Sequence, residues 1–107
     1  MTSLEESLVQ QQAISGIYLP EIECEIRSGD ADWEVVATVQ DSQGRKQNLS
    51  VSKGMVASSE GKNYLTVGIV QVDHLQRRAL IELPHEADSG VNRLWAPFTA
   101  FRRESRA

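Results

Sequence analysis

The chain has 107 residues, 40% of them hydrophobic and 24% charged. This composition suits a single globular domain and is too apolar for a fully disordered chain. The formal net charge of −4 is unevenly divided: residues 1–41 carry nine acidic and one basic side chain, and residues 42–107 carry six acidic and ten basic ones. Such a bipolar surface favours the steering of a partner, whereas the acidic total weakens long-range attraction to nucleic acid.

A short helix is expected over residues 3–13. Ser3 and Glu6 have the spacing of a capping box, and Leu4 and Leu8 follow at helical spacing. The expected organisation is an N-terminal helical or flexible segment (1–16), a single β-barrel-like domain (17–101) and a basic C-terminal tail (102–107).

The compartment is expected to be the cytoplasm. The acidic N-terminus lacks the basic and apolar regions of a secretory signal. The sequence contains no apolar run of about 18 residues, so neither a membrane span nor a membrane partner is predicted. The single cysteine, Cys24, cannot form an intramolecular disulfide, and its alternation with Ile22 and Ile26 predicts a buried, inert thiol.

The first half of the domain alternates apolar and polar residues with the period of β-strands. Ile22, Cys24 and Ile26 are predicted to face the core from one strand, and a turn at 29–32 follows. The next strand, 33–41, and its partner, 45–52, are joined by a hairpin turn in which Gly44 supplies a left-handed residue. The inward residues predicted from these two strands are Trp33, Val35, Ala37, Val39, Leu49 and Val51.

The second half predicts further strands. Residues 53–55 break the pattern, a short strand leads to a turn at Gly61, and the stretch 64–72 is predicted as one central strand bent at Gly68. A hairpin over 73–77 would place Asp73 opposite Arg78. The last strand, 94–101, contains Pro97, which favours a position at the sheet edge because proline has no N–H to donate.

These elements predict a mainly β fold: a small antiparallel, strongly bent sheet or SH3-like barrel of about six strands with a short N-terminal helix. Three of the connections are tight turns. The exception is a loop of roughly eight residues between Pro84 and Arg93, and longer loops are where binding residues tend to lie.

This loop contains residue types that also occur in metal and catalytic sites. His85, Glu86 and Asp88 are three potential ligands within four residues, and Asp73 or His74 would have to complete a metal site. The sequence has neither a helical His pair nor a Cys pair, and Ser89 does not lie in a G-x-S-x-G elbow. A small enzyme or metal-binding protein using residues 85–93 is therefore the third-ranked hypothesis, and no catalytic residue, metal or cofactor is predicted.

A non-catalytic binding module is the first hypothesis, with another protein as partner. Homodimerisation through the N-terminal helix or the edge strand is one form of it. Single-stranded nucleic-acid binding is the alternative, since Trp95, Phe98 and Phe101 lie near Arg93, Arg102 and Arg103. The candidate binding residues are His85, Asp88, Arg93, Trp95 and Arg78: Trp95 as an aromatic anchor, the arginines as anion or partner contacts, and Asp88 as a residue that shapes the loop.

Overall fold

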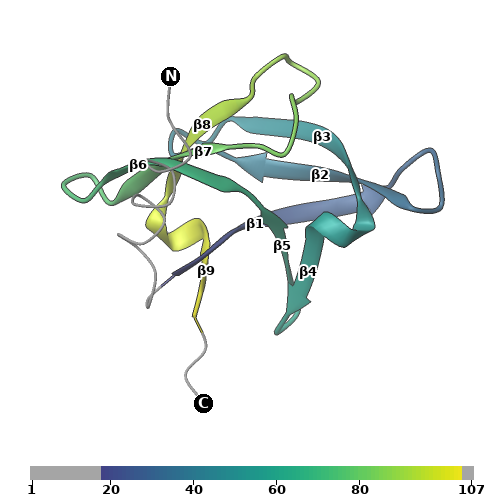
Figure 1. Cartoon of the computed structure of the whole chain (residues 1–107), viewed down its shortest axis with the longest axis horizontal. Coiled ribbons are helices and arrows are strands. Elements are labelled where there is room, and N and C mark those ends of the chain that lie inside the picture. The colour runs from purple at the N-terminus through teal and green to yellow at the C-terminus, as the bar shows by residue number, and fades with distance from the viewer. Residues whose placement is uncertain (1–17, 105–107) are drawn as a thin grey trace.

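The computed structural model describes residues 18–104, which form nine strands and two short 3-10 helices (Figure 1). The strands are β1 (Tyr18–Ser28), β2 (Glu34–Gln40), β3 (Lys46–Ser52), β4 (Val56–Ser59), β5 (Lys62–Thr66), β6 (Gly68–Asp73), β7 (Arg78–Glu82), β8 (Arg93–Pro97) and β9 (Phe101–Arg103). The 3-10 helices are η1 (Lys53–Met55) and η2 (Phe98–Ala100). The helix expected over residues 3–13 and the segment 1–16 lie outside the described residues. Within residues 18–104, no helix has the length and apolarity needed to cross a membrane.

The strands form two antiparallel sheets, which confirms the mainly β, antiparallel prediction. The larger sheet has the order β3-β2-β1-β5-β4, with β9 also paired to β1, and the smaller one has the order β6-β7-β8. The long strand β1 joins the two halves of the larger sheet: its second half pairs with β2, and its first half pairs with β5 and β9. Of the two predicted forms, a bent sheet or an SH3-like barrel, a closed barrel is not formed, because the described strands pair as two separate sheets.

The division between the sheets occurs at Val67. The stretch predicted as one central strand is two strands, since β5 pairs with β1 and β6 pairs with β7. Between them Val67 is buried, and its N–H donates to the carbonyl oxygen of Pro20 at 3.0 Å. The chain therefore passes from one sheet to the other just before Gly68, where a bend or bulge was predicted. This split contributes to the larger number of strands, as does η2, which separates β8 from β9 within the single last strand expected over 94–101.

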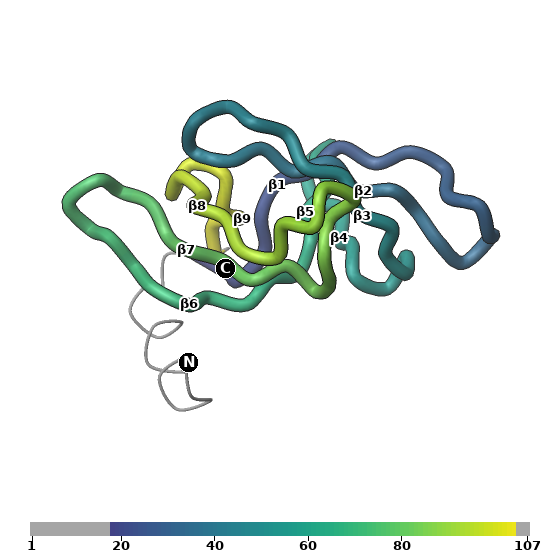
Figure 2. Tube along the Cα trace, turned by 90° about the horizontal axis from the view of Figure 1, so that it is seen from above, coloured from purple at the N-terminus to yellow at the C-terminus, as the bar shows by residue number. Residues whose placement is uncertain are grey.

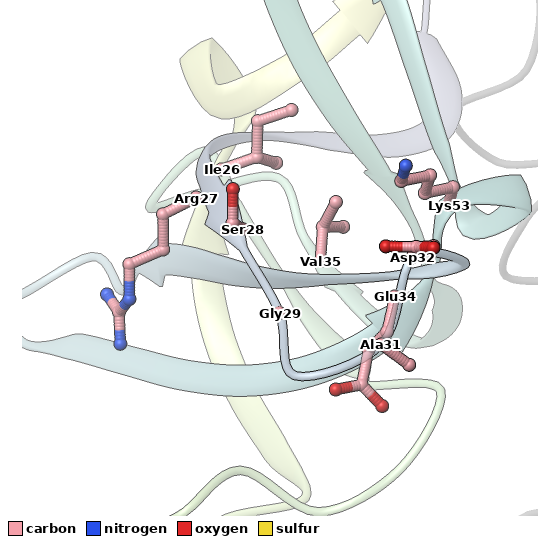
Figure 3. Close-up of a pocket in the computed structure, with 9 residues that line it drawn as sticks. All are labelled: Ile26, Arg27, Ser28, Gly29, Ala31, Asp32, Glu34, Val35 and Lys53. Carbon is pink, nitrogen blue, oxygen red and sulfur yellow. The ribbon is translucent and has the colours of Figure 1, made fainter.

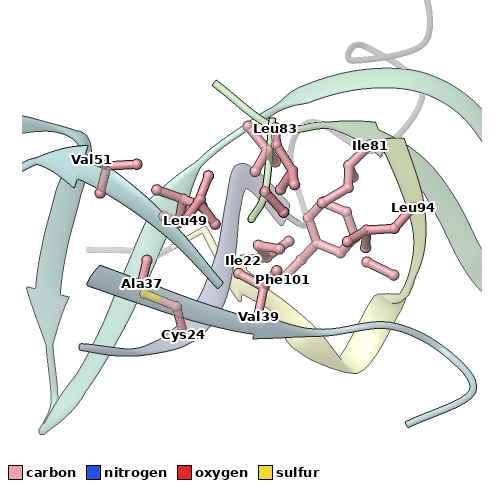
Figure 4. Close-up of a cluster of buried hydrophobic side chains, with 14 of the residues drawn as sticks. Ile22, Cys24, Ala37, Val39, Leu49, Val51, Ile81, Leu83, Leu94 and Phe101 are labelled. Carbon is pink, nitrogen blue, oxygen red and sulfur yellow. The ribbon is translucent and has the colours of Figure 1, made fainter. Parts of the chain in front are cut away.

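The hydrophobic core draws on both sheets (Figure 4). Most of the predicted inward residues are buried, which confirms the alternation in β1, β2 and β3; these are Ile22, Cys24, Val35, Ala37, Val39, Leu49 and Val51. Two predictions are wrong. Ile26 is 41% exposed near the outer end of β1, and Trp33 is 64% exposed because a bond from the Glu34 N–H to Ala31 places it in the turn before β2.

Two predictions made for the strands of the smaller sheet are confirmed. Strand β8, with Pro97 as its last residue, lies at the sheet edge as predicted. Asp73 faces Arg78 across the β6–β7 hairpin, and Arg78 Nε lies 3.4 Å from Asp73 Oδ2. Arg102 and Arg103, which were assigned to the basic tail predicted over 102–107, belong to β9.

Candidate functional site

A groove of about 330 Å³ lies where β8 meets the loop between β2 and β3. We call it the Trp95 groove. Its apolar lining is Leu80, Val91, Leu94 and Trp95, and its polar lining is Asp41, Ser42, Gln43, Arg45, Gln47, Arg78 and Arg93. The groove therefore contains three of the five predicted site residues, Arg78, Arg93 and Trp95, and excludes His85 and Asp88.

A backbone hydrogen bond between the two sheets holds the groove together. The N–H of Ser42 donates to the carbonyl oxygen of Trp95 at 2.8 Å. Strand β8 bonds to β7 through alternate residues, and bonds from Leu83 to Asn92 and from Phe98 to Arg77 continue that ladder. The backbone of Trp95 consequently faces away from β7, where the β2–β3 loop can reach it.

Trp95 is half-buried, with a guanidinium on one face of its indole ring. The Cζ atom of Arg78 lies 4.3 Å from the ring centroid, within cation–π distance. The Asp73 carboxylate holds Arg78 in this position. The pKa of Asp73 lies below its usual value, chiefly because the Gln76 N–H stabilises the charged form; burial opposes this, and the Arg78 guanidinium lowers the pKa further.

Among residues 18–104, Asp41 is the one charged residue that is buried. Its carboxylate accepts hydrogen bonds from the backbone N–H groups of Gln43 and Arg45, both at 2.9 Å, and from Arg45 Nε at 2.8 Å. Burial raises the pKa of Asp41, but these donors outweigh burial and the net pKa is lowered. Asp41 thereby fixes the 41–45 turn, in which Gly44 has the positive φ (84°) that the sequence predicted.

Each of the three arginines that line the groove is held by a carboxylate. Each forms its ion pair through Nε: Arg45 with Asp41, Arg78 with Asp73, and Arg93 with Glu82 at 3.3 Å. Among the described residues, the hydrogen bonds of these three guanidinium groups run through Nε, and their terminal Nη atoms donate no hydrogen bond. Three arginines and one aspartate line the groove, so its lining carries a charge of +2; the carboxylates of Asp73 and Glu82, which lie outside the lining, balance this charge from behind.

The loop that the sequence singled out has a structural role. The N–H of Asp88 donates to the carbonyl oxygen of Asn48 at 2.8 Å, and Ser89 Oγ donates to Gln47 Oε1. The buried Ala87 closes the loop through a bond from its N–H to Val91. The loop thus covers part of the free edge of β3, which would otherwise be open to pairing with another strand. Gly90 has the predicted positive φ, 89°.

His85 and Asp88 do not assemble a polar site. Both side chains are exposed, and the one contact of the imidazole is His85 Nδ1 at 3.4 Å from the carbonyl oxygen of Glu86. Over the part of the chain that the structure describes, no three His, Cys, Asp or Glu side chains converge as metal ligands. Asp88 contributes to the loop through its backbone N–H, and its carboxylate forms no hydrogen bond or ion pair with the described residues.

The aromatic platform expected for nucleic acid is also not assembled. Phe98 and Phe101 are buried in the core. Arg102 lies away from Trp95: its Nη1 is 3.2 Å from Glu21 Oε1, and its Cζ is 5.8 Å from the ring centroid of Tyr64. Trp95 and Arg93 are therefore the members of that predicted set that line the groove.

The sequence pointed to the β8 side of the groove and missed the β2–β3 side. Asp41 and Arg45 were read as turn residues, and their turn was predicted correctly. Their contribution to the groove depends on the contact between Ser42 and Trp95, for which the local sequence contains no signal.

Cys24 belongs to β1, and its side chain is buried in the core (Figure 4). Burial, and to a smaller extent the charge of Glu23, raises the pKa of its thiol to about 11. A protonated, buried thiol is a poor nucleophile.

Comparison of the chain with protein-family models, with curated proteins and with solved structures gives no significant match.

Proposed function

We propose that the protein is a non-catalytic binding module for another protein, and that the Trp95 groove holds an acidic segment of that partner. The supporting observation is the set of three arginines fixed through Nε around a half-buried tryptophan. Fixing a guanidinium in advance reduces the side-chain entropy lost on binding. The free Nη edges match the geometry of a carboxylate, and Trp and Arg are the residue types most enriched at the centres of protein interfaces.

A protein segment fits the groove better than a single-stranded nucleic acid does. Base stacking needs open aromatic faces along a positively charged groove. Here Arg78 occupies one face of Trp95, and Asp41 lies in the groove itself. Mixed polar and apolar lining of this kind is typical of protein interfaces.

Binding also accounts for the described chemistry better than catalysis does. The thiol of Cys24 is protonated and buried, and His85 has neither a carboxylate nor a hydroxyl partner within hydrogen-bond distance. A general acid or base needs a positioned partner and a suitably shifted pKa. The cytoplasm is the compartment we propose, because the free Cys24 suits a reducing environment.

Titration of labelled protein with a blocked hexapeptide of alternating glutamate and leucine, followed by NMR, tests this proposal. We expect shifts at the Trp95 indole and at the side chains of Arg45, Arg78 and Arg93. Affinity should be about tenfold weaker for the glutamine–leucine counterpart, because the charge-assisted hydrogen bonds are lost. The Trp95→Ala variant should not bind. Equal affinity for both peptides, or tighter binding of a single-stranded oligonucleotide at the same resonances, would contradict the proposal.

A further inference from the structure

The loop between β1 and β2 has the chemistry that the Trp95 groove is proposed to bind. Trp33 is 64% exposed and is flanked by the carboxylates of Asp30, Asp32 and Glu34. No basic residue occurs from residue 28 to residue 36. Residues 29–34, here called the Trp33 loop, therefore combine an exposed aromatic ring with a charge of −3, whereas the groove lining carries +2.

Backbone hydrogen bonds fix the Trp33 loop in place. The N–H of Gly29 donates to the Glu34 carbonyl oxygen at 3.3 Å, and the N–H of Lys53 donates to the Trp33 carbonyl oxygen at 2.9 Å. Although the backbone of Trp33 is anchored in this way, most of its side chain remains in solvent. A rigid loop that presents an aromatic side chain loses little conformational entropy when it docks.

A hollow of about 390 Å³ lies beside the Trp33 loop, and part of its lining is apolar (Figure 3). Ile26 and Val35 line it together with Asp32 and Lys53, and Ile26 is 41% exposed. The lining also contains Arg27 and Glu34, so this end of the molecule combines the exposed Ile26 with charged residues of both signs, as protein interfaces often do.

The Trp33 loop cannot enter the groove of its own chain. It precedes β2 at Glu34, whereas the groove begins at Asp41, just after Gln40 ends the same strand. The six residue steps from Glu34 to Gln40 separate the two sites by about 20 Å. Figures 1 and 2 show the β1–β2 loop at one end of β2 and the β2–β3 loop, beside β8, at the other end.

We infer that copies of this chain associate head to tail, the Trp33 loop of one copy docking in the Trp95 groove of the next. This inference rests on the proposed function of the groove, to which it gives a partner. The Nη edges of the groove arginines receive the carboxylates of Asp30 and Asp32, and Trp33 packs on the apolar lining. Each dimer retains one free loop and one free groove, so further copies add, forming a ring if the rotation between copies closes and an open filament if it does not.

Two defective variants and their mixture test the inference. Trp33→Ala removes the loop's aromatic ring and leaves the groove intact, and Arg45→Gln combined with Arg93→Gln weakens the groove and leaves the loop intact. In sedimentation velocity, the average mass of the wild type should rise with concentration and fall with added salt. Each variant alone should stay monomeric, and their equimolar mixture should form a dimer and nothing larger.

Leu75→Ala is the matched control, because Leu75 is 93% exposed in the β6–β7 turn and should leave association unchanged. Association of either variant alone to the wild-type extent, or oligomers larger than a dimer in the mixture, would overturn the inference.

A peptide separates failure of this inference from failure of the proposed function. A blocked peptide of residues 28–35 should bind the Trp33→Ala protein and shift the Trp95 indole resonance. Its version with Asp30→Asn and Asp32→Asn should bind about tenfold more weakly. If the wild type stays monomeric at millimolar concentration and the peptide does not bind, head-to-tail association is wrong. The proposed function is then tested separately, by the titration with the glutamate–leucine peptide.

Discussion

Asp41 shows how one buried side chain supports both a turn and a surface. It accepts two backbone N–H groups of its own turn and the Nε of Arg45, which lines the groove. The same carboxylate therefore fixes the backbone of the β2–β3 loop and the direction of one guanidinium. A buried charge is tolerated here because three donors replace its hydration.

Asp41→Asn should lower the free energy of unfolding by about 1–3 kcal/mol, because the amide cannot accept from all of these donors. Urea denaturation at neutral pH measures the loss. Asp88→Asn, at an exposed carboxylate, should change stability little. An unchanged midpoint for Asp41→Asn would mean that the carboxylate is not needed.

The lowered pKa of Asp41 predicts the sign of a pH effect. A carboxyl whose pKa is lower in the folded state than in the unfolded state contributes stability above its usual pKa of 3.8, and this contribution is lost as pH falls further. The wild type should therefore lose stability below about pH 4, and Asp41→Asn should lose less. Urea midpoints from pH 7 to pH 3 test this; parallel curves for the two proteins would contradict it.

The thiol of Cys24 should resist labelling in the native state. With a pKa of about 11, only about one thiol in a thousand is ionised at pH 8, and the core restricts access. An aromatic disulfide reagent should therefore react slowly with the folded protein and stoichiometrically in urea. Fast, complete labelling without denaturant would show that β1 opens readily.

Among the elements, the β1–β2 loop depends most on a single residue. A Cβ on Gly29 would lie 2.8 Å from the carbonyl oxygen of Glu34, to which the Gly29 N–H donates. Gly29→Ala should therefore cost about 1–3 kcal/mol of stability. In the matched variant Gly54→Ala, the added carbon would meet Ser52 Oγ at 3.7 Å, and stability should change by less than about 0.5 kcal/mol. Equal effects would argue against a close approach at Gly29.

Elements formed by local pattern could be predicted from the sequence, and those set by distant contacts could not. The alternation Val35, Ala37, Val39 identified the buried face of β2, and the 73–78 hairpin followed from its turn length. Local patterning does not encode the partner of a strand, so the separation of β5 from β6 was missed. The groove could not be predicted for the same reason, because residues of the β2–β3 loop reach Trp95 only once both sheets are packed.

At the scale of the whole molecule, the two sheets share one core and should unfold together. Buried side chains from β2, β3 and β5 pack in one cluster with those from β7 and β8. The two tryptophans report on different parts: Trp33 precedes β2 in the larger sheet and Trp95 lies in β8 of the smaller one. Trp33→Phe and Trp95→Phe each leave one reporter.

Fluorescence of each single-tryptophan variant in urea should give a transition that coincides with loss of the circular dichroism signal of that variant, as expected for a two-state domain. A Trp95 transition that precedes the loss of sheet structure would instead indicate that the smaller sheet detaches first.

The 83–92 loop has a consequence for how freely this sequence can change. Main-chain bonds of Leu83, Ala87, Asp88 and Gly90, with the hydroxyl of Ser89, hold it in place, whereas the side chains of Pro84, His85 and Glu86 point into solvent. Replacing these three side chains leaves every one of those bonds intact. This makes residues 84–86 a natural place for sequence drift during evolution and a suitable position for grafting a foreign epitope onto a stable scaffold.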